Sequence, residues 1–358
     1  MQNNYTKYIP YQWFTRFVIR KSKIVNILIL ALSLIGISCL DEYKVPLRQE
    51  TEKLVIEGLL TNDPLEQYLR LSLTTQFGSA SNITPANGAF VEIVGDNKES
   101  VIFRPVPSDL GIYKPNLNSF KAQFGVSYVI NIKLPDGRIF KSAPQKMLQP
   151  VPVNKLNATF SDTPPYGFRI SLDFKDPAET KNFYRWTARG YYQRQSVGVP
   201  VGFGGGVCCN RCWVLKEDKS VNILSDALVN GGMIKERPAY FSPFFVLGQH
   251  LIEVKQYNIS QEAYTFWKKY QDQQTRTGTI FDPLPAPLQG NVVNISDPSD
   301  IALGFFEVAA ISKIRIEPFA NTQGVIAFNL QNPLYIPAGD CMLAFPFSVY
   351  SAVRPPNW

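Results

Sequence analysis

The chain has 358 residues, of which 45% are apolar and 18% charged, and its mean hydropathy is -0.09. These values exclude a disordered tail and a polytopic membrane protein, and at roughly 150 residues per domain the length predicts two domains. The formal charge is +7, but five of the 36 basic residues and no acidic residue precede Cys39. The remainder has 31 basic and 29 acidic residues without a run of like charges, which gives nucleic-acid binding no support.

Residues 1–38 have the pattern of a secretory signal peptide. Basic residues between Arg16 and Lys23 precede an apolar run from Ile24 to Ile37. This run is too short to cross a bilayer core of about 30 Å as a helix, but it suits the apolar region of a signal peptide. An uncleaved anchor or a buried helix is the alternative. Ser38 before Cys39 resembles a bacterial lipobox, in which the cysteine becomes the lipidated first residue of the mature protein.

Two acidic residues follow the predicted lipidation site at Cys39. The placement of Asp41 and Glu42 resembles the export signal that sends Bacteroidota lipoproteins to the outer face of the outer membrane. The alternative is that the two acids belong to a solvated tether and have no such role. We expect a lipid-anchored outer-membrane protein that faces the cell exterior, with residues 39–53 as the tether.

Residues 54–145 are expected to form a β-sandwich of immunoglobulin-like or transthyretin-like type. Apolar and polar residues alternate at 69–74 and 128–134, and this period of two is typical of half-buried strands. Pro135-Asp136-Gly137 has the turn chemistry of a hairpin that leads into the strand at 138–142. Short apolar segments at 54–60, 90–94 and 101–103 complete a set of strands of the expected size.

A proline-punctuated segment at 144–155 predicts a spacer, and a larger β-rich domain follows at 156–358. Alternation at 168–174 and 184–190 predicts strands. One short amphipathic helix is expected near 260–274, with Ser260 as its N-terminal cap. Its apolar stripe predicts packing against a sheet, with a ligand platform as the alternative. This stripe consists of Ala263, Phe266, Trp267 and Tyr270. The fold class is therefore mainly β.

Few side chains are available for catalysis. His250 is the only histidine, which excludes a HExxH site and a two-histidine iron site, and its alternating surroundings favour a structural or surface role. A carboxylate-based hydrolase would need acids such as Asp173 and Asp297 in one cleft, with a raised pKa for one of them. Sequence proximity does not indicate such a cleft, so we expect no enzyme, no catalytic residue, no metal site and no cofactor.

Four cysteines remain once Cys39 is assigned to the lipid: Cys208, Cys209, Cys212 and Cys341. An even number in an exported chain favours two disulfides. A bond between neighbours would be strained, so we expect Cys341 to pair with Cys208 or Cys209 and Cys212 to pair with the other. A zinc site made by the four cysteines and a redox-active Cys209-x-x-Cys212 are the alternatives.

Several stretches together resemble one family, the Bacteroidota outer-membrane lipoproteins catalogued as domain of unknown function 4249. The matching stretches cover nearly the whole mature chain in order. They are Cys39 with Tyr43 and Pro46, LVIEGLLT (54–61), FKDPAETKNFYRW (174–186), CNRCW (209–213), EAYTFWKK (262–269), FDPLPAPLQGNV (281–292), LGFF (303–306), GDC (339–341) and the final Pro356-Asn357-Trp358. In this family a second cysteine often stands beside the last one, and Met342 occupies that position here. Cys208 is a candidate for the cysteine that takes the place of this missing partner.

The resemblance implies an accessory of a TonB-dependent outer-membrane transporter, beside which such proteins are commonly encoded, and it implies no reaction. We expect a surface-exposed lipoprotein that acts as a non-catalytic accessory or substrate-capture partner of such a barrel. A chain rich in Phe, Tyr and Trp agrees with protein-facing and ligand-facing surfaces. A free-standing glycan-binding or adhesion module is the second hypothesis, and the carboxylate hydrolase is the third.

Overall fold

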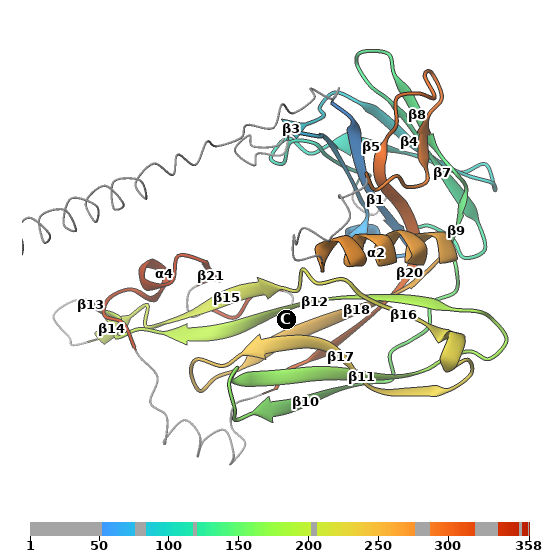
Figure 1. The fold of residues 1–358 in the computed structure, drawn as a ribbon. Coiled ribbons are helices and arrows are strands. Elements are labelled where there is room, and N and C mark those ends of the chain that lie inside the picture. The colour runs from blue at the N-terminus through green and yellow to red at the C-terminus, as the bar shows by residue number, and fades with distance from the viewer. Residues whose placement is uncertain are drawn as a thin grey trace, which may run out of the picture. The chain divides into compact units, whose positions relative to one another are not determined.

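A computed structural model describes residues 52–75, 84–116, 120–201, 206–275, 287–318, 336–350, 353–356 and 358. The predicted signal peptide, Cys39, Asp41 and Glu42 lie outside the described residues. The prediction of a mainly β fold is confirmed (Figure 1). Among these described residues the one long helix is α2 (Gln261–Gln274), and α4 (Cys341–Ala344) is a single turn.

The first half of the described chain is strands joined by short turns. Pro135-Asp136-Gly137 forms the predicted hairpin, in which the N–H of Leu134 donates to the carbonyl of Arg138 at 2.9 Å. The elements are β1 (Leu54–Thr61), the short helix η1 (Pro64–Glu66), β2 (Tyr68–Leu73), β3 (Thr84–Pro85), β4 (Phe90–Gly95), β5 (Ser100–Pro105), β6 (Ile112–Lys114), β7 (Ser127–Lys133), β8 (Ile139–Ser142) and β9 (Gln145–Lys146).

The second half contains longer strands, as the alternating segments predicted. Its elements are β10 (Lys155–Ser161), β11 (Gly167–Lys175), β12 (Phe183–Gln195), β13 (Val199–Val201), β14 (Gly206–Cys208), β15 (Arg211–Glu217), β16 (Asn222–Ser225), the short helix η2 (Asp226–Leu228), β17 (Met233–Pro243), β18 (His250–Ile259), β19 (Val292–Asn294), β20 (Leu303–Ile316) and β21 (Ser348–Tyr350).

Strand β20 joins the two halves. It pairs in parallel with β1 on one side and antiparallel with β18 on the other, so that a 16-stranded sheet runs from β19 through β7, β2, β1, β20 and β12 to β21. β19 pairs with β8. Strands from residues 292–316 therefore complete the N-terminal sandwich, and residues 51–358 form one compact unit. The two predicted domains share these strands instead of meeting at a boundary near 150.

Side chains of β20 alternate between different cores because successive residues of a strand point to opposite faces. Phe306, Val308 and Ala310 pack into the core of the N-terminal sandwich. Phe305 and Ala309 point to the opposite face, toward α2. β20 thus supplies apolar side chains both to the core of the N-terminal sandwich and to the contact with α2.

A second core lies on one face of β12 and β18. Tyr184 and Trp186 of β12 pack there against the three-stranded sheet β10-β11-β17, for example against Phe174 of β11. Trp186 Nε1 donates to Gln256 Oε1 at 2.8 Å, which satisfies a buried polar pair. The predicted alternation of β12 is confirmed, because Arg185 points to the other face, where α2 lies.

Helix α2 covers that other face (Figure 1). Ser260 is its N-terminal cap as predicted, since Ser260 Oγ accepts from the N–H of Ala263 at 3.1 Å. Ala263 is buried against the sheet, and Phe266 and Trp267 are half-buried. The predicted packing of the aromatic stripe on a sheet is confirmed.

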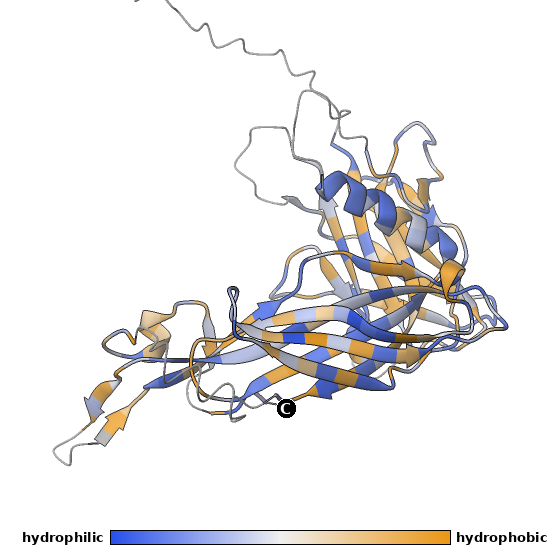
Figure 2. Cartoon of the chain, turned by 60° about the horizontal axis from the view of Figure 1, so that its bottom comes forward, coloured by the Kyte–Doolittle hydropathy of each residue, from blue (hydrophilic) through white to orange (hydrophobic). Residues whose placement is uncertain are grey.

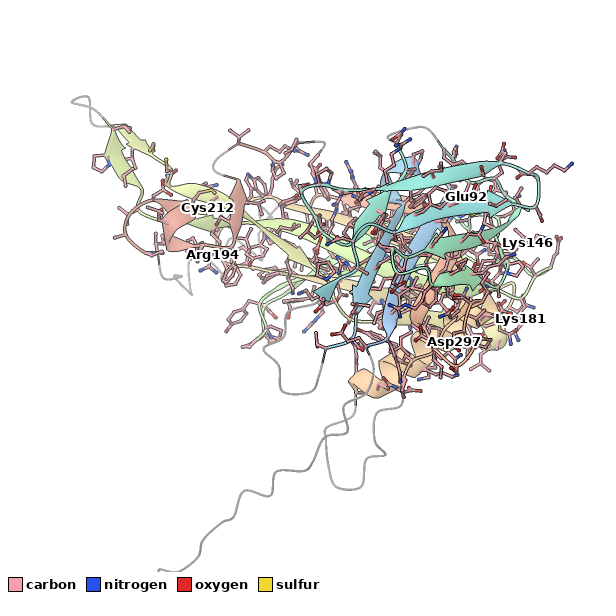
Figure 3. All side chains as sticks on the ribbon, turned by 90° about the horizontal axis from the view of Figure 1, so that it is seen from above. Glu92, Lys146, Lys181, Arg194, Cys212 and Asp297 are labelled. Carbon is pink, nitrogen blue, oxygen red and sulfur yellow. A yellow bond between two sulfur atoms is a disulfide. The ribbon has the colours of Figure 1, made fainter. Side chains whose placement is uncertain are left out.

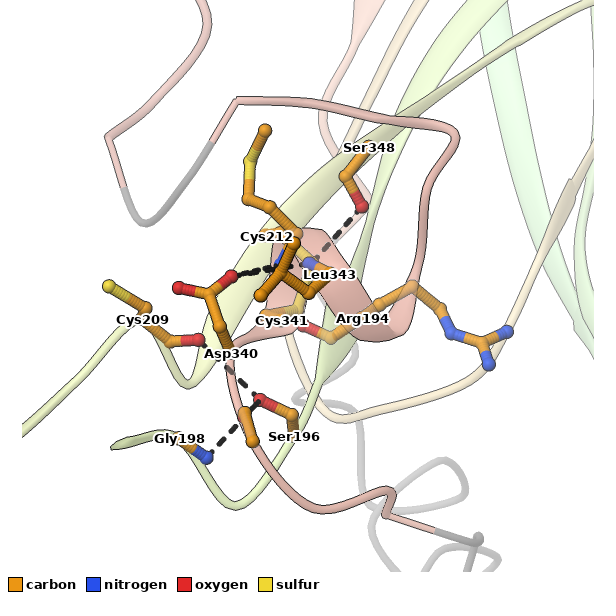
Figure 4. The surroundings of a disulfide bond; sticks show 11 residues. Arg194, Ser196, Gly198, Cys209, Cys212, Asp340, Cys341, Leu343 and Ser348 are labelled. Carbon is orange, nitrogen blue, oxygen red and sulfur yellow. Dashed lines mark hydrogen bonds between the residues drawn. A yellow bond between two sulfur atoms is a disulfide. The ribbon is translucent and has the colours of Figure 1, made fainter. Parts of the chain in front are cut away.

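One disulfide ties the C-terminal part of the chain to β15 (Figure 4). Cys212 and Cys341 are bonded, fully buried and separated by 129 positions. The expected pairing of Cys341 with Cys208 or Cys209 is wrong, because β15 and α4 bring Cys341 to Cys212. Cys208 and Cys209 are free thiols. In the chain-entropy model, closing so long a loop contributes about 4 to 5 kcal/mol to stability.

A substitution at Gly304, at the start of β20, tests how closely β20 must approach β1. The φ of Gly304 is +87°, and a Cβ there would lie 2.0 Å from the carbonyl oxygen of Ile56. We expect Gly304→Ala to destabilise the protein by about 4 kcal/mol or more in urea unfolding, because backbone must move. Gly137→Ala is the matched control, since Gly137 has a φ of +95° but no atom within 4 Å of such a Cβ. Equal losses for the two variants would show that close packing of β20 is unimportant.

Candidate ligand-binding cavity

A cavity of about 450 Å³ lies where α2, β1, β12 and β20 meet. β1 contributes Gly58 and Leu59, β20 contributes Phe305 and Glu307, and α2 closes it with aromatic rings. α2 packs on the sheet through Ala263, near its start, and its larger side chains Phe266, Trp267 and Tyr270 line the cavity. Its volume falls within the range of about 300–1,000 Å³ typical of small-molecule sites.

A buried ion pair forms the polar part of the cavity wall. Arg185 Nη2 donates to Glu307 Oε1 at 2.5 Å, and Trp267 Nε1 donates to Glu307 Oε2 at 2.5 Å. The exposed fractions of the two charged side chains are only 10% and 4%. Burial opposes the charge on Arg185, but the Glu307 carboxylate raises the pKa of the guanidinium above its usual value. The pair is therefore charged but neutral as a whole.

Two aromatic rings lie against the guanidinium of Arg185. Its Cζ lies 4.2 Å from the ring centre of Tyr257 and 4.8 Å from that of Trp267, which are cation–π distances. In the part of the chain that the structure describes, Arg185 Nε is buried and has no hydrogen-bond partner. This N–H does not open to the cavity, and leaving it unpaired costs free energy.

The remaining walls are mostly apolar and aromatic. Burial raises the pKa of the Tyr68 phenol, so its hydroxyl stays protonated and is able to donate or accept a hydrogen bond. Asn222 and Ser220 add uncharged polar groups, and Glu57, Asp218 and Lys219 add charged ones. The principal ring-bearing residues are Tyr68, Phe266, Trp267, Tyr270 and Phe305. Such a wall suits a ring-shaped molecule with few charges and several polar groups.

Exposed apolar side chains gather at another place, around the β13–β14 hairpin and α4. We call this set the apolar end. Figure 2 shows apolar stretches in both elements, at one end of the long strands β12 and β15. Leu343 is 84% exposed and Phe347 is 83% exposed. The members are Val197, Val201, Val207, Ile336, Leu343 and Phe347. Contiguous exposed apolar surface is typical of protein–protein contacts.

The acids considered for a hydrolase have separate surroundings. Asp173 on β11 accepts from the N–H of Glu236 at 2.7 Å, whereas Asp297 follows β19 and accepts from Ser299. These hydrogen bonds lower the pKa of both carboxyls, whereas an acid catalyst needs a raised pKa. Asp173 lies on β11 of the three-stranded sheet, whereas Asp297 follows β19 of the 16-stranded sheet, and Figure 3 shows Asp297 at the opposite side of the view from Cys212.

His250 is buried beside Phe168 and Phe244, and its Nδ1 lies 2.7 Å from Ser242 Oγ. Burial lowers its pKa to about 3, so the ring is neutral at ordinary pH. Within the described residues, no three His, Cys, Asp or Glu side chains are grouped to hold a metal ion. Among the same residues, none of the helices has the length and apolar character to cross a membrane.

Sequence reasoning missed Arg185, Glu307 and the cavity they line. The available signal was a single acid in an otherwise apolar strand, LGFFEVAAI (303–311), and an arginine in the alternating β12 segment. A lone charge among buried residues requires a partner. The sequence does not say which partner, because β12 and β20 are separated by more than a hundred residues.

The Arg185–Glu307 pair gives a direct stability prediction. Glu307→Gln leaves the guanidinium buried without a counter-charge, so we expect urea unfolding to show a loss of about 3 to 5 kcal/mol. Glu57→Gln is the matched control, because Glu57 pairs with Arg70 at 3.8 Å with both side chains largely exposed. That variant should lose less than about 1 kcal/mol. A loss for Glu307→Gln no larger than for the control would contradict the assignment.

The comparisons with known proteins agree with the motifs of the sequence. No curated protein is similar enough to the chain to count as a match. A family model described as Domain of unknown function (DUF4249) matches residues 40–315, which include β1, β12, α2 and nearly all of β20. The resemblance of the tail at 339–341 lies beyond the matched residues. The predicted family is confirmed: the chain belongs to Domain of unknown function (DUF4249).

Proposed function

We propose that the protein is a lipid-anchored, surface-exposed protein of the outer membrane that captures a small substrate for a TonB-dependent transporter without transforming it. The signal-peptide pattern and Cys39 support the address, and the family resemblance supports the partner. The aromatic cavity around Arg185 and Glu307 is the observation that carries the capture role. No charged group of the pair is free for acid–base chemistry, because each oxygen of Glu307 accepts a hydrogen bond.

The cavity also agrees with the second hypothesis, a free-standing glycan-binding module. In both cases the ligand is a neutral, ring-bearing molecule that stacks on Tyr270 or Phe266 and accepts from Arg185 or Tyr68. Only the presence of a barrel partner distinguishes the two. The apolar end supports a protein partner, because glycan binding alone does not need exposed Leu343 and Phe347, and it therefore favours the accessory hypothesis over a module that binds only glycans.

Capture is tested with a neutral probe that carries both an aromatic ring and a sugar ring, p-nitrophenyl β-D-glucopyranoside. We expect saturable binding in isothermal titration calorimetry, weakened at least about tenfold by Tyr270→Ala, which corresponds to about 1.4 kcal/mol. Phe90→Ala is the control, because Phe90 is 51% exposed on β4 and does not line the cavity. Absence of binding, or equal weakening by both variants, would contradict capture in this cavity.

Docking is tested at the apolar end. We expect the double variant Leu343→Asp, Phe347→Asp to lose its barrel partner in affinity purification from native membranes, while its unfolding free energy changes by less than about 0.5 kcal/mol. Leu228→Asp is the matched control, because Leu228 on η2 is 96% exposed but lies outside the apolar end. Retention of the barrel by the double variant, or its loss from the control as well, would contradict this docking surface.

A further inference from the structure

Four cysteines lie close together in the fold, on or beside β14, β15 and α4, and form two pairs with different surroundings. Cys212 and Cys341 are bonded, fully buried, and 5.7 Å apart between their Cα atoms. Cys208 and Cys209 are half-buried thiols whose Sγ atoms lie 2.6 Å apart. In Figure 4 the Cys209 side chain points away from the Cys212–Cys341 bond. The adjacent thiols are therefore placed to react with each other and with reagents in solvent.

The backbone explains why two neighbouring side chains meet. Successive side chains of a strand point to opposite faces, which would separate the two sulfurs. Cys208 is the last residue of β14, and Cys209 leaves the strand with a φ of +58°. This left-handed conformation is uncommon for a residue other than glycine. It breaks the alternation and brings both sulfurs to one side.

We propose that Cys208 and Cys209 form a reversible vicinal disulfide, a redox modification site that is separate from the structural Cys212–Cys341 bond. The oxidant is a disulfide, either of a small thiol such as glutathione or of a protein thiol oxidase. One cysteine sulfur attacks the external disulfide and releases one thiol. The second sulfur then attacks the resulting mixed disulfide and releases the other. The protein loses two protons and two electrons, and the external disulfide becomes two thiols.

Hydrogen bonds distinguish the two sulfurs in this sequence of steps. Contacts with Cys208 and with the Asp340 carboxylate raise the pKa of the Cys209 thiol to about 12. Since the thiolate is the nucleophile, Cys208 makes the first attack. The Asp340 carboxylate accepts a hydrogen bond from the Cys209 thiol, and in the second step the proton of that thiol passes to the thiolate released from the external reagent.

A disulfide between neighbouring residues closes a small, strained ring, and this strain makes the Cys208–Cys209 bond easy to reduce again. Adjacent Cα atoms are about 3.8 Å apart across a trans peptide, below the range of about 4.4–6.8 Å found in ordinary disulfides. Strained or exposed disulfides have the higher reduction potentials. Strain therefore makes the Cys208–Cys209 bond reversible, whereas the buried Cys212–Cys341 bond stays closed.

Oxidation also changes the start of α4. Asp340 is the N-terminal cap of that helix, where its Oδ1 accepts from the N–H of Met342 at 2.7 Å. The N–H of Cys341 donates to the carbonyl of Cys209 at 2.7 Å. Loss of the Cys209 S–H removes one donor to Asp340. The redox state of the pair is thereby coupled to the segment that carries Leu343 and Phe347.

The test uses full-length protein extracted from native membranes and equilibrated over a range of oxidised to reduced glutathione. Free thiols are then blocked with N-ethylmaleimide before trypsin digestion and mass spectrometry. Cleavage after Arg194 and Arg211 places Cys208 and Cys209 in one peptide, and Cys212 falls in the next. We expect the 195–211 peptide to change between a doubly alkylated form and an unalkylated form two hydrogens lighter, while Cys212 stays linked to Cys341.

Cys209→Ser is the control variant, in which Cys208 should form a mixed disulfide with glutathione instead of the lighter peptide. The proposal is overturned if the 195–211 peptide of the natural sequence stays doubly alkylated at every ratio. It is also overturned if its cysteines are found linked to Cys212, to Cys341 or to a second chain. Opening of Cys212–Cys341 before the vicinal pair would contradict the assigned order of stability.

Discussion

Parallel pairing between β1 and β20 is the constraint on which the rest of the structure depends. The first and one of the last strands of the described chain must meet before the core of the N-terminal sandwich is complete. Gly304 permits this approach, because any side chain at that position would collide with the carbonyl of Ile56. Once β20 is in place, its alternating side chains fill the N-terminal sandwich on one face and support α2 on the other. Pairings between strands that are far apart in the sequence, such as β1 with β20 and β8 with β19, predict slow folding.

The cavity follows from the same constraint. Glu307 lies on the α2 face of β20, and Arg185 lies on the α2 face of β12, with β18 between them. A second set of ion pairs supports this face, because Lys255 and Lys313 both donate to Glu66 of η1, at 2.6 Å and 2.8 Å. Because Arg185 and Glu307 are paired with each other, this part of the cavity wall is neutral as a whole beside its aromatic rings, while Glu57, Asp218 and Lys219 also line the cavity. This combination favours binding over acid–base catalysis.

Much of the local structure could be predicted from the sequence, and the reasons are physical. Ser260 and the apolar stripe locate α2, and Pro135-Asp136-Gly137 locates a hairpin, because caps and turns depend on neighbouring residues. The long-range pairings could not be predicted. Nothing local indicates that Cys341 meets Cys212 or that β19 completes the sheet beside β8, since those contacts depend on the packing of the whole chain. The cavity was missed for the same reason.

The central claim is that a lipid-anchored capture protein serves an outer-membrane transporter. Mass spectrometry of the protein extracted gently from native outer membranes, recording its N-terminal mass and all co-purifying proteins, tests this claim most directly. The account predicts an acylated Cys39 at the N-terminus and a TonB-dependent barrel in stoichiometric amount. An acylated Cys39 without a barrel would contradict the accessory role, and an unprocessed Met1 would contradict the lipid anchor itself.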